Sequence, residues 1–179
     1  MNNYLLHQSL RELWDLSVAK YKAGDRGAAD FFTAEQSALL AEIGHGKQEF
    51  YDFVEDNINY DGDPDFETFL LVAMQRISYF RGTLKGKPAE KIVDTGDLPG
   101  KKEQVRGIEW LPRLIPKAHA KLKGEMSDDL MYLCAGDRAF FSERNIHPAE
   151  FLAFVAANMD NDEAVVDFVV SRSNPSSSS

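Results

Sequence analysis

The chain has 179 residues, a formal net charge of −9, and a composition of 44% hydrophobic and 11% aromatic residues. This length suits one ordinary domain, and the apolar content is too high for a disordered polypeptide. The acidic balance argues against a nucleic-acid partner, and no apolar run approaches the roughly 20 residues that span a bilayer.

The cysteine content bears on the cellular compartment. Cys134 is the single cysteine, which excludes an internal disulfide. Residues 1–20 lack the basic start, apolar run and small-residue cleavage site of a secretion signal. We therefore expect a cytoplasmic protein without a membrane partner. No cofactor is predicted, because the chain carries no complete cofactor motif.

Helical signals dominate the first part of the chain. Apolar residues recur at helical spacing up to Tyr21 and stop at Gly24, which predicts an N-terminal helix within residues 1–27. The sequence TAEQ that starts at Thr33 has the capping-box form, and Gly44 suits the end of the helix it opens. A short helix is expected to follow, from about Lys47 to Asn57.

A strongly apolar helix is predicted next, followed by a connector without helical periodicity. Asp63 is predicted to cap a helix in which Pro64 takes the first position, and a broad apolar face then runs to Phe80. From Gly82 to Gly107 the chain holds five glycines and two prolines without a helical period, so a linker is predicted.

An internal similarity appears at an offset of 101 residues. Residues 38–57 align with 139–158 without a gap, with seven identities in twenty positions. This indicates a helical unit used twice, although helix composition alone would also explain it. Phe53 and Phe154, at matching positions, are predicted to be equivalent core residues.

Together these signals predict an all-α fold, a compact helical domain built from two similar helix pairs joined by a basic Gly/Pro-containing linker. The expected boundaries are an N-terminal helix at 1–27, a single helical domain at 28–173 and a disordered tail at 174–179. Within the domain, half one is 33–81, the linker is 82–107 and half two is 108–173.

Positive charge is concentrated in residues 81–123, which carry 11 basic and 5 acidic side chains. Within it Arg113, Lys117 and Lys121 recur every four residues, opposite apolar positions, so one helix face is predicted to be basic and the other to be core. A solvated surface is one interpretation. The other is a ligand-binding face that, with Arg138, receives an anionic small molecule or an acidic protein.

Cys134 allows two interpretations as well. Free cysteine usually behaves as a small buried hydrophobic residue. Alternatively, a helix N-terminus and Arg138 activate its thiol, with Asp137 and His147 as further catalytic candidates. Asp137 by itself is expected to cap a helix start.

No metal site is predicted from the sequence. The stretch 57–68 places oxygen ligands like a calcium loop, but Thr68 stands where the loop requires a bidentate glutamate. The histidines lack the paired spacing of metal ligands.

One region has a family resemblance. It contains Leu-Pro-Arg at 111–113, a helix rich in lysine and alanine, Cys-x-x-Asp-Arg-x-Phe at 134–140 and Pro-x-Glu-Phe at 148–151. These motifs resemble the bacterial family called domain of unknown function 5069, and the likeness extends from about Thr33 to Val170. Pro116 departs from the pattern and is expected to move the helix start toward Ile115. The resemblance implies a small helical bacterial protein and implies no activity.

Two functional hypotheses result. The favoured one is a non-catalytic binding or regulatory module for an anionic ligand or acidic partner. The alternative is a small cysteine-dependent enzyme or redox sensor that uses Cys134. Thiol reactivity at neutral pH separates them, and neither hypothesis specifies an oligomeric state.

Overall fold

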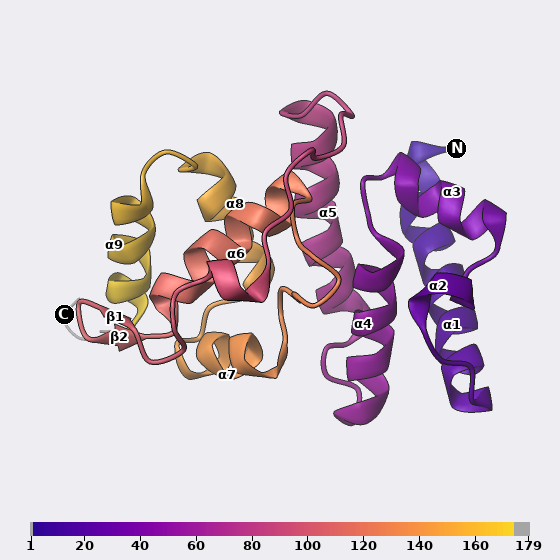
Figure 1. Ribbon diagram of the computed structural model, residues 1–179, viewed down its shortest axis with the longest axis horizontal. Coiled ribbons are helices and arrows are strands. Elements are labelled where there is room, and N and C mark those ends of the chain that lie inside the picture. Colours follow the sequence, from indigo (N-terminus) through magenta and orange to yellow (C-terminus); the bar gives the residue numbers. More distant parts are fainter. Residues whose placement is uncertain (1, 174–179) are drawn as a thin grey trace. The chain divides into compact units, whose positions relative to one another are not determined.

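The computed structural model describes residues 2–173 (Figure 1). Helices make up nearly all the regular structure of this part, which confirms the predicted all-α fold. The exception is a small antiparallel pair formed by β1 (Gln104–Val105) and β2 (Ile108–Glu109). The predicted disordered tail at 174–179 lies outside the described residues.

The chain forms two compact units. Unit 1 is Met1–Pro88, and unit 2 is Ala89–Ser179. The division falls inside the predicted linker 82–107. It also differs from the predicted separation of residues 1–27, because the N-terminal helix belongs to unit 1 and packs there against two later helices.

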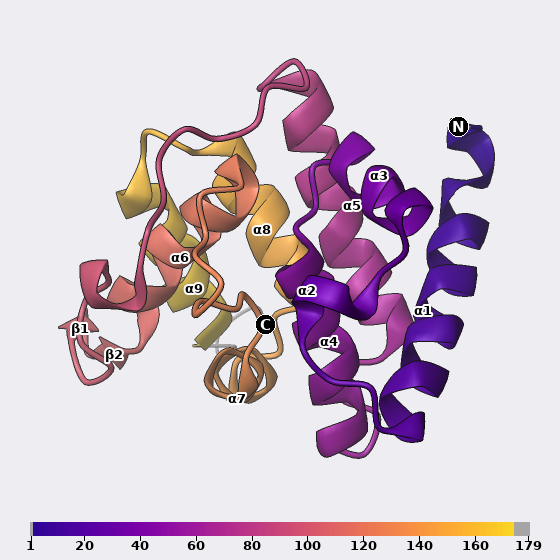
Figure 2. The ribbon, with the colours of Figure 1, turned by 45° about the vertical axis from the view of Figure 1, so that its right-hand side comes forward.

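Unit 1 contains a short 3-10 helix, η1 (Asn3–Leu5), and five α-helices. These are α1 (Leu6–Ala23), α2 (Ala28–Phe31), α3 (Ala34–Glu42), α4 (Lys47–Asn59) and α5 (Phe66–Gly82). Figures 1 and 2 show α1 alongside α4 and α5, in agreement with their contacts.

Two helix starts in unit 1 test the predicted caps. The capping box before α3 is confirmed: Thr33 Oγ1 accepts from the Gln36 N–H at 3.2 Å, and Gln36 Oε1 accepts from the Thr33 N–H at 2.9 Å. The predicted cap of α5 by Asp63 is wrong. Asp65 caps this helix instead, accepting from the Thr68 N–H at 2.8 Å. The helix therefore begins after Pro64 rather than with it.

An aromatic cluster forms the centre of unit 1. Phe69 of α5 stacks on Trp14 of α1, with ring centroids 5.2 Å apart. It also contacts the edges of Phe50 and Phe53 of α4, at 5.0 and 5.2 Å. All four side chains are buried, so this cluster joins three helices into one core.

Between residues 89 and 173, unit 2 contains a 3-10 helix, η2 (Thr95–Asp97), the β1–β2 pair and four α-helices. These are α6 (Leu111–Lys123), α7 (Ala135–Glu143), α8 (Pro148–Ala157) and α9 (Asp162–Ser173). Helix α6 packs against both α8 and α9 (Figures 1 and 2).

The start of α6 differs from the prediction. Pro116 lies inside the helix, which already begins at Leu111, so the expected shift toward Ile115 is wrong. Pro112 explains this early start, because proline has no N–H to lose in the first helical turn. Arg113 is therefore part of the helix.

The two units share one stretch of backbone geometry at the 101-residue offset. Helix α7 begins and ends 101 residues after α3, and α8 begins 101 residues after α4. The N-caps have nearly the same dihedrals, φ −65° and ψ 166° at Thr33, and φ −60° and ψ 168° at Cys134. Gly44 and Asn145 both adopt positive φ after these helices. A common origin of the two stretches stays a prediction.

The equivalence of Phe53 and Phe154 is wrong. Phe53 is fully buried, whereas Phe154 is half-buried and stacks on Phe168, with ring centroids 4.5 Å apart. Helix α4 contacts α1 and α2, whereas α8 contacts α6 and α9, so the two aligned helices pack against different neighbours.

Candidate functional site

A buried ion pair lies at the centre of unit 2. Lys117 of α6 donates to both carboxylate oxygens of Asp137 in α7, at 3.0 Å to Oδ1 and 2.9 Å to Oδ2. Their side chains are 2% and 0% exposed. Because transfer of a charge from water to a protein interior is unfavourable, each of these groups requires the other.

Asp137 receives two further hydrogen bonds. The Trp110 indole N–H donates to Oδ1 at 2.8 Å, and the Leu133 backbone N–H donates to Oδ2 at 2.8 Å. Each carboxylate oxygen thus accepts from two donors. Asp137 also lies in the first turn of α7, where the helix dipole favours negative charge. The expected N-cap role is wrong in detail, because the N-cap residue is Cys134.

Two features place the donors of Asp137: strained backbone at Trp110 and Leu133, and close contact between Gly136 and the Trp110 ring. Trp110 and Leu133 have φ values of 72° and 75°, which residues with a Cβ rarely adopt. Gly136 lies against the indole: a Cβ at this position would come within 2.5 Å of the Trp110 ring. A glycine in the first turn of α7 therefore leaves the space that the Trp110 ring occupies.

Cys134 lies beside the same lysine. The Lys117 Nζ is 3.5 Å from Cys134 Sγ, within hydrogen-bonding distance for sulfur. Cys134 is partly exposed and is the N-cap of α7, where backbone N–H groups of the helix start are directed toward it. The sulfur thus lies next to a cation and a helix N-terminus, the surroundings found at reactive thiols.

The cations predicted to form a basic face are on α6 but are buried. Arg113, Lys117 and Lys121 are 7%, 2% and 2% exposed. Arg113 donates to the Pro99 carbonyl at 2.9 Å, and burial lowers the pKa of Lys121 to about 7. The predicted contrast between a basic face and a core face is therefore wrong, since both faces of α6 are core. Anion binding by these residues stays a prediction.

The roles predicted for Arg138 and His147 at the thiol stay predictions. The Arg138 backbone N–H donates to the Cys134 carbonyl at 3.0 Å. Arg138 is buried and donates to the Leu133 carbonyl at 2.9 Å. His147 is exposed and is the N-cap of α8, where its Nδ1 accepts from the Ala149 N–H at 3.1 Å. Lys117 is a basic side chain in contact with the sulfur, and the sequence had suggested it only as an anion ligand.

Sequence patterns did not reveal three contributors to this site: Trp110, Leu133 and Gly136. Trp110 and Leu133 depend on positive φ, and Trp110 and Gly136 depend on contact between segments more than 20 residues apart, neither of which a local pattern reveals. One signal was present. The 101-residue offset aligns Cys134 and Asp137 with Thr33 and Gln36, the two residues of the capping box.

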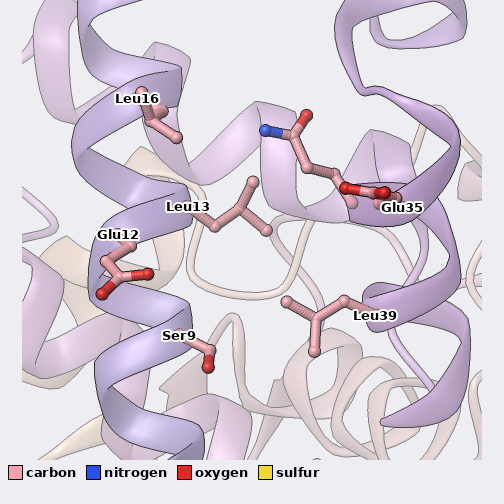
Figure 3. Close-up of a pocket in the computed structure, with 7 residues that line it drawn as sticks. Ser9, Glu12, Leu13, Leu16, Glu35 and Leu39 are labelled. Atoms are coloured by element: carbon pink, nitrogen blue, oxygen red, sulfur yellow. The ribbon is translucent and has the colours of Figure 1, made fainter. Parts of the chain in front are cut away.

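Two pockets lie in the described part of unit 1. One, of about 260 Å³, lies between α1 and α3, where Leu13 and Leu39 point toward each other and Glu12 and Glu35 lie at its edge (Figure 3). The second, of about 440 Å³, lies between the start of α1 and the start of α5. Neither contains any of the predicted site residues.

Residues 2–173 were also compared with the features of metal sites and of membrane-spanning helices. This part of the chain contains no group of three or more His, Cys, Asp or Glu side chains arranged to hold a metal ion. None of its helices is both long and apolar enough to cross a bilayer.

Comparison with known families identifies the second half of the chain. Residues 97–179 match the family model described as Domain of unknown function (DUF5069). The match contains every residue of the Lys117–Asp137 site. The predicted likeness is thereby confirmed from residue 97 onward and stays a prediction for 33–96. No curated protein and no solved structure matches the chain significantly.

Proposed function

We propose that this chain, whose residues 97–179 match the DUF5069 family model, is a redox-responsive regulatory module in which Cys134 is the responsive residue. The observation that supports this is the 3.5 Å contact between Lys117 Nζ and Cys134 Sγ at the start of α7. A basic side chain and a helix N-terminus are the surroundings in which reactive thiols are found, and oxidants act on such thiols.

Position makes this thiol suited to regulation. Cys134 is partly exposed, so a small oxidant reaches it, while its neighbour Lys117 holds the buried charge of Asp137. Any change at the sulfur therefore affects the ion pair that joins α6 to α7. The proposal includes the cytoplasmic location inferred from the sequence, because a reducing compartment keeps a single cysteine as a thiol until an oxidant appears.

The test is the reaction of Cys134 with hydrogen peroxide at neutral pH. We expect the parent protein to react faster than free cysteine and to change its melting temperature on oxidation, with both effects absent from Cys134→Ser. A Lys117→Arg variant tests the role of the cation, since arginine keeps the charge. A parent thiol that reacts no faster than free cysteine would contradict the proposal.

Binding of an anionic ligand or an acidic partner is the second candidate. The observation that favours it is exposure: Lys101 and Lys102 lie on the surface of unit 2, unlike the buried cations of α6. We expect melting temperature to rise with phosphate or acidic metabolites at fixed ionic strength in the parent. A Lys101→Glu, Lys102→Glu double variant should lose this rise, and Lys22→Glu, at an exposed position of α1, should keep it. A parent that gains nothing from any anion rules this candidate out.

We also propose that the two units arose by duplication of one helical segment. The shared bounds of α3 and α7 support it, as do the matching dihedrals at Thr33 and Cys134. Relatives in which the two segments are more alike at the aligned positions are the expected finding, and a shared ancestor with only one helix pair would be decisive. If the two segments of each homologue are no more similar to each other than two unrelated helices are, a common origin is contradicted.

A further inference from the structure

We infer that oxidised Cys134 forms a covalent sulfur–nitrogen bond with Lys117. The inference rests on the proposed function, because it specifies the product that forms once the thiol is oxidised. The modification site consists of Cys134 Sγ and Lys117 Nζ, and the oxidant is a peroxide.

The geometry brings the two atoms together before any reaction. Lys117 Nζ lies 3.5 Å from Cys134 Sγ, and the two residues come from separate elements, α6 and the start of α7. Lys117 is buried and its ammonium is fixed by two hydrogen bonds to Asp137. Two reactive groups held at such a distance react far faster than the same groups free in solution.

The chemistry has two balanced steps. In the first, the thiol of Cys134 attacks the peroxide oxygen, which gives a sulfenic acid and one water as the O–O bond breaks. In the second, the neutral amine of Lys117 attacks the sulfenyl sulfur. The S–O bond breaks, the S–N bond forms, and the hydroxide that leaves takes a proton from nitrogen as a second water. One peroxide is reduced to water and one thiol is oxidised.

Asp137 takes the proton that Lys117 must lose before it attacks. Its Oδ1 and Oδ2 lie 3.0 and 2.9 Å from Nζ, so the transfer follows an existing hydrogen bond. The Trp110 and Leu133 N–H groups keep the carboxyl in place throughout. Asp137 thus both positions the amine and accepts its proton.

Other partners for the sulfenic acid are less suitable. The chain has no second cysteine, so an internal disulfide cannot form. Arg138 is a poor nucleophile because a guanidinium is delocalised, and it donates to the Leu133 carbonyl. Lys121 lies one helical turn, about 5.4 Å along the axis, beyond Lys117 on α6, and Lys117 is the residue whose contact with the sulfur is established. Lys117 is the amine in contact with the sulfur.

The bond would change unit 2 in a specific way. It converts the ammonium of Lys117 into a neutral nitrogen and leaves the transferred proton on Asp137, so the buried ion pair becomes two neutral groups that Trp110 and Leu133 still contact. It also closes a covalent loop from α6 to the start of α7. Thiol reductants cleave such a bond and restore both side chains, which makes the change reversible.

The test is mass spectrometry of the whole protein after treatment with hydrogen peroxide. We expect a species lighter than the reduced chain by the mass of two hydrogen atoms, which dithiothreitol returns to the starting mass. After tryptic digestion, the peptide that contains Cys134 should be joined to one that contains Lys117, with cleavage after Lys117 blocked.

Three variants serve as controls. Cys134→Ser should give no linked species. Lys117→Arg keeps a cation beside Asp137 but cannot form the bond, so its sulfenic acid should persist and be trapped by a dione reagent severalfold more than in the parent. Lys101→Arg, the same change at an exposed position of unit 2, should form the linked species as the parent does.

The outcomes separate this inference from the proposed function. If Cys134 is not oxidised in the parent, both fail. If it is oxidised but the dione traps it equally in the parent and in Lys117→Arg, the proposed function stands and the cross-link is excluded. A product that carries an additional oxygen between the two residues would also overturn the direct S–N condensation.

Discussion

Lys117 and Asp137 bind each other through two hydrogen bonds, at 2.9 and 3.0 Å, with both side chains removed from water. Such a pair contributes little beyond what two well-packed apolar residues would contribute. The pair matters for stability when one partner is removed, because the remaining charge then stays buried without a counter-charge.

The first prediction concerns this asymmetry. Lys117→Met should lower the free energy of unfolding by about 3–5 kcal/mol, because the Asp137 carboxylate would remain buried without its cation. Adding Asp137→Asn should recover much of the loss, since an amide oxygen still accepts from Trp110 while the charge is gone. Urea denaturation of both single variants and the double variant measures this, and purely additive losses would contradict the coupling.

The second prediction concerns the contact of Gly136 with Trp110. Alanine usually stabilises a helix relative to glycine, by about 1 kcal/mol. Gly136→Ala should instead destabilise the protein by about 1–3 kcal/mol, because its Cβ would lie 2.5 Å from the indole ring. Gly82→Ala in α5 is the matched control, since a Cβ there meets nothing within 4 Å. Equal effects of the two changes on thermal unfolding would exclude the steric explanation.

The third prediction is a pH dependence. Burial lowers the pKa of Lys121 from 10.5 to about 7. Between these values the unfolded chain binds a proton that the folded chain does not, so this residue makes the free energy of unfolding rise with pH. Below about pH 7 both states are protonated and the cost of the buried charge is fully present.

The measurement compares Lys121→Met with the parent by chemical denaturation from about pH 6 to pH 9. The parent should gain up to about 1.4 kcal/mol per pH unit more than the variant above pH 7. The exposed Lys101→Met serves as control and should follow the parent. Parallel curves for parent and Lys121→Met would show that this lysine titrates normally.

The fourth prediction separates two aligned phenylalanines. Phe53→Ala should cost about 3–5 kcal/mol, because the side chain is fully buried and contacts Phe69. Phe154→Ala should cost about 1–2 kcal/mol, since the ring is half-buried and its contact is the stacked Phe168. A variant series measured under one condition gives the comparison, and similar losses at the two positions would argue against the difference in burial.

The sequence predicted the fold well because the relevant signals are local. Helical periodicity located most of the helices, and the capping box at Thr33 fixed the start of α3 to the residue. The cap of α5 failed because Asp63 and Asp65 offer the same chemistry two residues apart, and the choice between them depends on the turn around Pro64.

The site was predicted only in part, for a different reason. The sequence identified Lys117, Cys134 and Asp137 separately but assigned them to a surface, a thiol and a cap. Periodicity shows which residues share a helix face, yet it does not distinguish a solvated cation from a buried one. That distinction depends on a carboxylate 20 residues away, which only the tertiary structure brings near Lys117.

The capping box of α3 and its counterpart at α7 imply a difference in the order of assembly. Thr33 and Gln36 complete their hydrogen bonds within four residues, so the first turn of α3 requires nothing from the rest of the chain. Asp137 depends on Lys117, so the corresponding turn of α7 acquires its full set of bonds only after α6 has formed. Amide exchange at Leu133, whose N–H binds Asp137, would therefore report the folding of a helix to which it does not belong.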